Sequence, residues 1–254
     1  EHSNIEQPEA QIAEATAVQG PSLEELQSKL GLKVMTEAWS GDLDGMIKRR
    51  VIRVLTVYGL GRYFIEDARE QGFAVETMKA FEASLNKGTT LAEHVYVIFV
   101  PVNREQLMSG LLEGRGDIIV AGWTITPKRQ DQVDFSIPVS KPLQEILVTG
   151  PSATELKTLN DLAGKTIYVR ESSSYYASLQ ALSEKLESTD LDAIDIQPIS
   201  ELLEDEDLLE MVSGGLLPWV VVDDYKADIF KDVFPKLVVR KDLVLRDGGE
   251  IAYA

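Results

Sequence analysis

The sequence predicts an α/β protein with two lobes, each built on a mainly parallel sheet flanked by helices. Apolar runs with strand character alternate with segments of helical period, the alternation restarts after residue 150, and 254 residues are enough for two cores. Strands separated by helices form mainly parallel sheets, because a helical crossover returns the chain to the same end of the sheet. We place the join between the lobes near residues 149–151, Thr-Gly-Pro.

The first lobe is expected to span residues 46–148 and to begin with a buried strand. Residues 51–58 are mostly apolar, as a strand buried on both faces requires. Residues 73–85 repeat apolar side chains at helical spacing, which predicts a helix. The other elements expected in this lobe are a strand at 94–102, a helix capped by Asn103 that runs through Leu112, and strands at 118–121 and 143–148.

The second lobe is expected to span residues 149–254, including a strand that returns toward the hinge. Its elements repeat the alternation of the first lobe. We expect a short helix and a strand within 160–170, helices at 172–186, 204–212 and 225–230, and strands at 195–199 and 219–222. The C-terminal part of the first lobe and any catalytic domain are expected to be absent from this stretch of sequence.

Residues 1–45 are predicted to be an acidic N-terminal leader with a short helix at 22–30, begun by Ser22 and supported by Glu25. They hold nine acidic residues against two lysines, a net charge of −7 within a total of −17. This charge argues against a nucleic-acid partner, because a phosphate backbone needs a basic protein face. Since residue 1 is Glu, we expect a processed piece of a longer protein whose signal or anchor lies upstream.

Residues 117–136 contain the most specific local pattern in the chain. An apolar strand is followed by Gly122, by the hydroxyls of Thr124 and Thr126, and by Arg129. A guanidinium offers a planar pair of donors to a carboxylate, so this segment indicates an anion-binding corner at the end of a strand. The alternative is that the two Thr residues only cap a short helix and that Arg129 is solvated.

The same segment resembles the extracellular solute-binding proteins of family 3, which have the two-lobed fold of type II periplasmic binding proteins. The resemblance extends from about residue 46 to the C-terminus, and it is closer still to the binding or regulatory domain of membrane-bound lytic transglycosylases of the F type. The runs that carry it are Trp39-Ser-Gly-Asp-Leu-Asp-Gly-Met46, Glu113-Gly-Arg-Gly-Asp-Ile118, Tyr168-Val-Arg-Glu-Ser-Ser-Ser-Tyr-Tyr176, Glu201-Leu-Leu-Glu-Asp-Glu-Asp-Leu-Leu-Glu-Met211 and Gly248-Gly-Glu-Ile-Ala252.

The resemblance implies how the carboxylate of a small zwitterion would be held. Arg129 and Thr124 of the first lobe would contact it, together with Ser173 of the second lobe. Ser172 and Ser173 precede a predicted helix, whose free N–H groups favour an anion. That these residues act only as an N-cap is the alternative, and it is compatible with the first reading.

The resemblance also implies a site for the ligand's ammonium group. Asp223, at the end of a predicted strand, and the backbone carbonyl of Gly122 would accept its hydrogen bonds. Asp224 is expected to face solvent or to cap the next helix. If Asp223 were that cap instead, the ammonium site would lose its charge.

For three further residues and one acidic run, the sequence allows either a role in the ligand cleft or a purely structural role. Tyr58 and Tyr63 would contact a ligand side chain or fill the core, which is the more common fate. Arg104 would reach a polar ligand group or, as is more common, lie on an exposed helix surface. The acidic run 204–207 is expected to point in different directions around one helical turn and to stabilise the helix dipole, rather than to form a site.

We therefore expect a non-catalytic periplasmic domain that closes around an amino acid or a cell-wall peptide fragment, without a metal or cofactor. The resemblance implies that it senses ligand for a fused transglycosylase domain or contacts peptidoglycan. The alternatives are part of a murein-cleaving enzyme whose catalytic domain is missing, or the solute-binding subunit of an amino-acid transporter. With no Cys and two His in the sequence, thiolate and His-rich metal sites are excluded.

Overall fold

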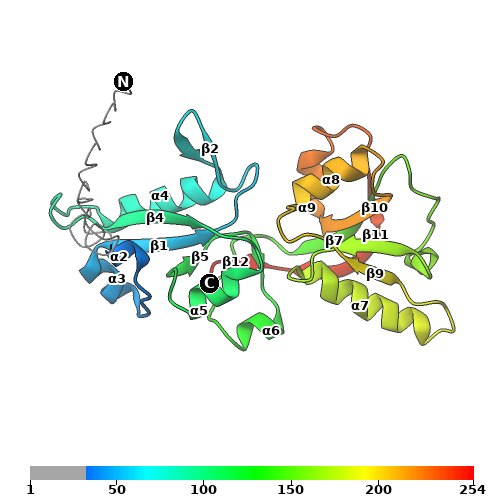
Figure 1. Ribbon diagram of the computed structural model, residues 1–254, viewed down its shortest axis with the longest axis horizontal. Coiled ribbons are helices and arrows are strands. Elements are labelled where there is room, and N and C mark those ends of the chain that lie inside the picture. The colour runs from blue at the N-terminus through cyan, green and yellow to red at the C-terminus, as the bar shows by residue number, and fades with distance from the viewer. Residues whose placement is uncertain (1–32) are drawn as a thin grey trace, which may run out of the picture. The chain divides into compact units, whose positions relative to one another are not determined.

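The computed structural model describes residues 33–254 (Figure 1). The chain divides into two compact units, residues 1–36 and 37–254. The described part of the first unit is helix α2 (Lys33–Thr36). The helix expected at 22–30, with most of the acidic leader, lies outside the described residues. Everything below concerns the second unit.

The first lobe is built on a parallel sheet with the strand order β4-β1-β5. Three helices contact or cover this sheet (Figure 1). The strands are β1 (Val51–Thr56), β4 (Tyr96–Pro101) and β5 (Ile118–Ile119), and the helices are α3 (Leu43–Arg49), α4 (Phe73–Leu85) and α5 (Gln106–Leu112). The expectations for these strands and for the helix at 73–85 are confirmed, but α5 begins after Glu105, and Asn103 is not its cap.

Alternation along β1 explains why helices cover both faces of this sheet. Ile52 and Val54 belong to a core cluster with Met78 of α4, whereas Leu55 lies in a second cluster with Leu107 of α5. Successive strand side chains point to opposite faces, so a strand that is apolar at nearly every position is buried on both. A short hairpin, β2 (Phe64–Glu66) with β3 (Arg69–Gln71), adds to this lobe.

The second lobe contains an antiparallel sheet with the order β10-β7-β11. Strand β7 (Leu143–Thr149) was expected to close the first lobe, but it is the central strand here, between β10 (Trp219–Asp223) and β11 (Val238–Gly249). Ile146 and Val148 contribute to one core cluster and Leu147 to another, so β7 is buried on both faces. This antiparallel sheet departs from the mainly parallel pattern expected for the lobe.

Helices cover both sides of this second sheet, and a parallel pair of strands lies beside it. Leu179 packs in the cluster of Leu147, whereas Leu208 and Ala227 pack in the cluster of Ile146. The remaining elements are η1 (Leu159–Leu162), β8 (Thr166–Val169), α7 (Ser174–Glu187), β9 (Asp195–Pro198), α8 (Asp205–Ser213) and α9 (Asp224–Phe230).

The chain passes between the lobes twice. It leaves the first lobe after β6 (Trp123–Thr124) and α6 (Pro127–Gln130), and it returns after β11 through β12 (Ile251–Ala252). Strand β12 pairs antiparallel with β6, and the carbonyl of Ala254 accepts a hydrogen bond from the Ile119 N–H at 2.6 Å. The return strand expected from the sequence therefore rejoins the first lobe beside the segment that carries Arg129.

Candidate ligand-binding site

The first-lobe corner is shaped by the sequence around Arg129. Gly122 has a φ of +57°, a conformation that a glycine adopts without strain, and it turns the chain between β5 and β6. Thr126 is the N-cap of α6, and its Oγ1 accepts a hydrogen bond from the Arg129 N–H. The Arg129 guanidinium then lies over the Trp123 ring, 4.6 Å from its centroid. Capping and an anion-binding role for this corner are thus compatible.

The Arg129 guanidinium contacts backbone carbonyls and no carboxylate. Nη1 donates to the Thr124 carbonyl at 2.6 Å and Nη2 to the Ser172 carbonyl of the second lobe at 2.9 Å. Across residues 33–254, Arg129 forms no ion pair. Burial lowers the pKa of Arg129 to about 10, and repulsion from Arg104 and Arg246 adds to this effect. An anion placed beside Arg129 would therefore be strongly favoured.

Ser172 and Ser173 lie at the start of α7, and the Ser172 carbonyl is the second-lobe group that contacts Arg129. Ser173 is the N-cap residue without a capping side-chain bond, and its Oγ donates to the Arg170 carbonyl at 2.8 Å. The Ser172 side chain turns toward Glu201, to which Oγ donates at 2.5 Å. Of the two, only Ser173 lines the cavity next to Arg129.

Asp223 occupies the N-cap position of α9, but its side chain makes no capping hydrogen bond. Its carboxylate pairs instead with Lys226 at 2.9 Å, and both residues are buried. The Lys226 Nζ also contacts Asp205 at 2.6 Å and the Tyr175 hydroxyl at 2.9 Å. The Asp223 carboxylate is therefore not used as a cap, but a lysine of the same lobe already pairs with it. Asp224 accepts from the backbone N–H of Tyr225.

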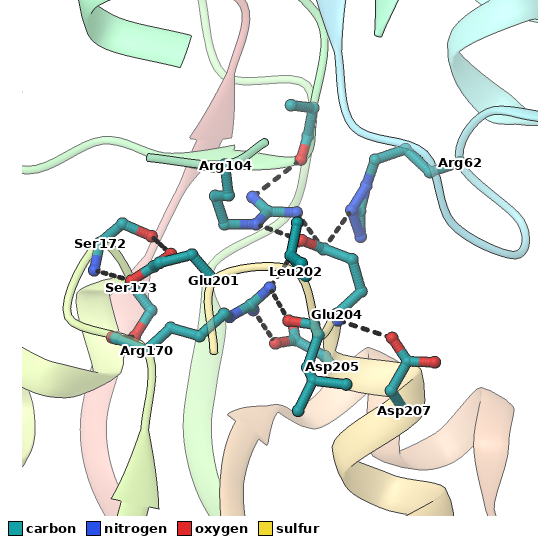
Figure 2. Close-up of polar contacts among 12 residues, drawn as sticks. Arg62, Arg104, Arg170, Ser172, Ser173, Glu201, Leu202, Glu204, Asp205 and Asp207 are labelled. Atoms are coloured by element: carbon teal, nitrogen blue, oxygen red, sulfur yellow. Dashed lines mark hydrogen bonds and ion pairs between the residues drawn. The ribbon is translucent and has the colours of Figure 1, made fainter. Parts of the chain in front are cut away.

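The first two residues of the acidic run 204–207, Glu204 and Asp205, form a buried ion cluster, contrary to the expectation that the run forms no site (Figure 2). Asp207 accepts the Glu204 backbone N–H in a capping box at the start of α8. Glu204 contacts Arg104 at 2.6 Å, Arg170 at 2.6 Å and Arg62 at 3.4 Å. Asp205 pairs with Arg170 and with Lys226. Burial opposes ionisation of both carboxyls, but the surrounding cations hold the pKa of Glu204 and that of Asp205 below their usual values.

The expectation that Arg104 lies on an exposed helix surface is wrong. Its side chain is buried, with 7% of its surface exposed, because Glu204 reaches it from the second lobe. Burial opposes the charged form, yet attraction to Glu204 raises the pKa of Arg104 above its usual value. Arg62, from the loop before β2, contacts the same carboxylate, so Glu204 bridges the two lobes.

A cavity of about 20 Å³ lies where these groups meet. Five of the residues predicted from the sequence line it, and three further lining residues, Arg170, Asp205 and Lys226, carry charge. The predicted five are Arg104, Gly122, Thr124, Arg129 and Ser173. The volume suits about a single water molecule, so a larger ligand needs the lobes to separate or the side chains to move.

The two tyrosines do not line this cavity. Tyr63 packs in the first-lobe core, with its ring centroid 5.3 Å from that of Phe99, so the core alternative holds for it. Tyr58 is 58% exposed and lines a separate groove of about 340 Å³ together with Asn103 and Leu202. Neither ring contacts the Arg129 corner.

Sequence reasoning missed the residues that neutralise the second-lobe carboxylates. Arg170 lies inside a run quoted for the resemblance, but its partners Glu204 and Asp205 are more than thirty residues away. Lys226 follows Asp223 by three residues, and this i,i+3 spacing was the feature of the sequence from which their ion pair could have been predicted. A lysine on a short helix is usually solvated, and the sequence offered no reason to bury this one.

Two α/β lobes joined by two crossing segments, with a charged cavity between them, define a class of ligand-binding protein. The model of the bacterial extracellular solute-binding proteins, family 3, matches residues 60–242, and this chain belongs to that family. The resemblance seen in the sequence is thereby confirmed. No helix among residues 33–254 is long and apolar enough to cross a membrane.

The curated relatives include proteins named membrane-bound lytic murein transglycosylase F. The one from Alteromonas mediterranea is 28% identical over 202 residues, which cover 79% of this chain and 42% of the relative. The one from Maricaulis maris is 31% identical over 178 residues, covering 70% and 36%. The chain thus spans about two fifths of the length of these relatives and corresponds to a solute-binding domain.

Solved structures confirm the two-lobed fold. An ancestral arginine-binding protein bound to arginine has a TM-score of 0.64 at 22% identity, covering 80% of this chain and 83% of its own. A substrate-binding protein of an uptake transporter from Streptococcus pneumoniae, with bound histidine, has a TM-score of 0.65 at 18% identity, covering 83% and 81%. At these identities the likeness concerns the fold.

Proposed function

We propose that this chain is a non-catalytic ligand-binding domain that encloses a small carboxylate-bearing molecule between its lobes. The observation that carries the proposal is the Arg129 guanidinium, which is partly buried at the lobe junction and, among the described residues, hydrogen-bonded only to carbonyls. A ligand carboxylate would supply the charge that Arg129 lacks, with Thr124 and Ser173 contacting it from the two lobes.

Entry of the ligand would require the lobes to open. The direct contacts that now bridge them include those of Glu204 with Arg104 and Arg62, and that of Arg129 with the Ser172 carbonyl. A cavity of about 20 Å³ supports this step, because even the smallest amino acid is larger. Opening at the two crossing segments would expose Arg129 to the solvent. Closure over a ligand would then remove the Arg129 guanidinium and the ligand carboxylate from water together, as a pair.

An amino acid or a cell-wall peptide fragment are the candidate ligands. The similarity to membrane-bound lytic murein transglycosylase F supports a sensing or regulatory role for a fused transglycosylase domain. In that setting the domain would act in the periplasm, anchored through a segment upstream of residue 1, and would contact peptidoglycan or its fragments. The similarity to the Streptococcus pneumoniae protein favours the alternative of a transporter's solute-binding subunit.

A thermal-shift screen against amino acids, their N-acetyl derivatives and murein stem peptides tests the proposal. We expect at least one carboxylate ligand to raise the melting temperature of the wild type, because a ligand that binds only the folded state stabilises it. The shift should disappear in Arg129→Ala. It should persist in Arg115→Ala, whose side chain is 41% exposed and pairs with Glu113.

Two results would contradict the proposal. One is the absence of a shift with every compound, and the other is a shift that survives in Arg129→Ala. Incubation with purified murein distinguishes a binding domain from the alternative of a murein-cleaving enzyme, because release of soluble muropeptides by this chain would show catalysis.

A further inference from the structure

Lys226 already provides an ammonium group beside Asp223. Its Nζ contacts three oxygen atoms, from Asp205 at 2.6 Å, from Asp223 at 2.9 Å and from the Tyr175 hydroxyl at 2.9 Å. A lysine ammonium has three N–H donors; it donates hydrogen bonds to Asp205 and to the Tyr175 hydroxyl, and Asp223 adds an ion-pair contact. These oxygens come from α8, β10 and α7, and Lys226 itself lies on α9; all four are elements of the second lobe.

This ammonium group is held in a charged and buried state. The Lys226 side chain is 7% exposed, and the ring centroids of Tyr175 and Tyr225 lie 5.5 Å from Nζ. Burial alone would lower the pKa of Lys226, but attraction to Asp205 and Asp223 raises it well above its usual value. The side chain is therefore a permanent part of the site at neutral pH.

The charges around the cavity leave little room for a second ammonium. Asp205 is shared by Lys226 and Arg170, and Glu204 is shared by Arg170, Arg104 and Arg62. Among the cavity-lining cations of the described chain, Arg129 stands alone in having no carboxylate partner. A bound anion would complete the pairing, whereas a bound ammonium would add a cation where Asp205, Glu204 and Asp223 are each already paired.

We infer that the ligand of this cleft is a carboxylate with no charged amine beside it, such as an N-acylated amino acid or a 2-hydroxy acid. This inference rests on the proposed function. Lys226 takes the place that a ligand ammonium would occupy against Asp223, while Arg129 remains available for the carboxylate. A free amino acid would have to displace Lys226 from three acceptors or bring a second cation beside it.

Calorimetric titration with matched ligand pairs tests this specificity. Each pair consists of a free amino acid and its N-acetyl derivative, which share the carboxylate and the side chain and differ in the charged amine. We expect the wild type to bind the N-acetyl member at least about tenfold more tightly. In Lys226→Gln, Asp223 becomes available and the preference should shift toward the free amino acid by at least about tenfold.

Two further variants control for folding. Lys226→Met keeps the length of the side chain without its charge and should shift the preference in the same direction. Lys241→Gln removes a lysine that is 58% exposed and pairs with Asp228, and it should keep the wild-type preference. Circular dichroism verifies that each variant is folded. If both Lys226 variants unfold, the relative affinity of the wild type for the free amino acid and its N-acetyl derivative alone tests whether the ligand lacks a charged amine.

The outcomes separate this inference from the function on which it rests. A wild type that binds free amino acids as tightly as their N-acetyl partners, or more tightly, overturns the inference and leaves a ligand-binding domain. An unchanged preference in folded Lys226→Gln overturns it as well. Failure of every compound in both sets to bind the wild type overturns the proposed function and the inference together.

Discussion

The two ends of the cleft differ in how their charges are compensated. At the first-lobe end, Arg129 is hydrogen-bonded to the carbonyls of Thr124 and Ser172 and has no carboxylate partner. At the second-lobe end, Lys226 and Asp223 form a complete pair within the same lobe. Both ends remove charge from water, which is tolerated when each charge is matched. The comparison teaches that the charges of one end are compensated within the lobe, whereas the partner that we propose for Arg129 at the other end is an external anion.

Glu204→Gln breaks the charge-paired side of this comparison and should have the largest effect. The substitution leaves Arg104, Arg170 and Arg62 without their shared carboxylate. Removal of one partner from a buried ion pair costs about 3–5 kcal/mol, and we expect the free energy of unfolding to fall by that amount. Urea unfolding measures it.

The matched control is Glu113→Gln, which removes a carboxylate that is 61% exposed and pairs with Arg115. Such a surface pair contributes little, because water screens it. Equal losses of stability in the two variants would mean that the Glu204 cluster does not hold the protein together.

Lys226→Met should destabilise the protein by about 3 kcal/mol, since Asp205 and Asp223 lose a shared cation. It should also weaken the acid dependence of stability. The pKa of Asp205 is lowered in the folded state, so its contribution is present above the unfolded pKa and is lost as the pH falls below about 4. Unfolding at several pH values should show a shallower acid decline in the variant, and an unchanged decline would contradict this account.

Arg129→Ala sharpens the comparison from the other end. We expect ligand affinity to fall by roughly 10- to 150-fold, the equivalent of about 1.5–3 kcal/mol for hydrogen bonds to a charged group. The free energy of unfolding without ligand should change by less than about 1 kcal/mol, because a poorly compensated, partly buried charge is removed together with its hydrogen bonds. Calorimetry and urea unfolding separate the two effects, and a stability loss as large as that of Lys226→Met would contradict the distinction.

Glu206→Gln should give the smallest effect, with the opposite sign. Glu206 is buried, and its Oε1 has no hydrogen-bond partner within residues 33–254. Burial raises the pKa of Glu206, so ionisation costs stability as the pH rises from the unfolded pKa through the folded one. The variant should be more stable than the wild type by about 1 kcal/mol near pH 8, and the difference should vanish near pH 4. A gain that is the same at both pH values would exclude this cause.

Much of the fold could be predicted because it follows from local periodicity. Helix α4 has the expected bounds Phe73–Leu85, since its apolar residues recur at helical spacing. Strand β11 was not predicted, because Arg240, Lys241 and Asp242 interrupt its apolar pattern. The assignment of β7 to the first lobe was wrong because its sequence gives its burial but not its partner strands.

The candidate site divides in the same way. Thr124, Thr126 and Arg129 lie in one short segment, so their proximity was predictable from the motif. The contact between Arg104 and Glu204 joins residues one hundred positions apart, and no local pattern indicates it. The roles assigned to Arg129, Ser173 and Asp223 remain predictions, and the last now depends on Lys226.

The central claim is that Lys226, and not the ligand, supplies the cation at Asp223. Protein carrying ¹⁵N at the lysine side chains tests this by NMR, because an ammonium group buried among three acceptors exchanges its protons slowly with water. We predict a protected ammonium signal that is absent from Lys226→Gln and that persists when the wild type is saturated with its ligand. Loss of that signal on ligand binding would mean that the ligand displaces Lys226, and it would contradict the account.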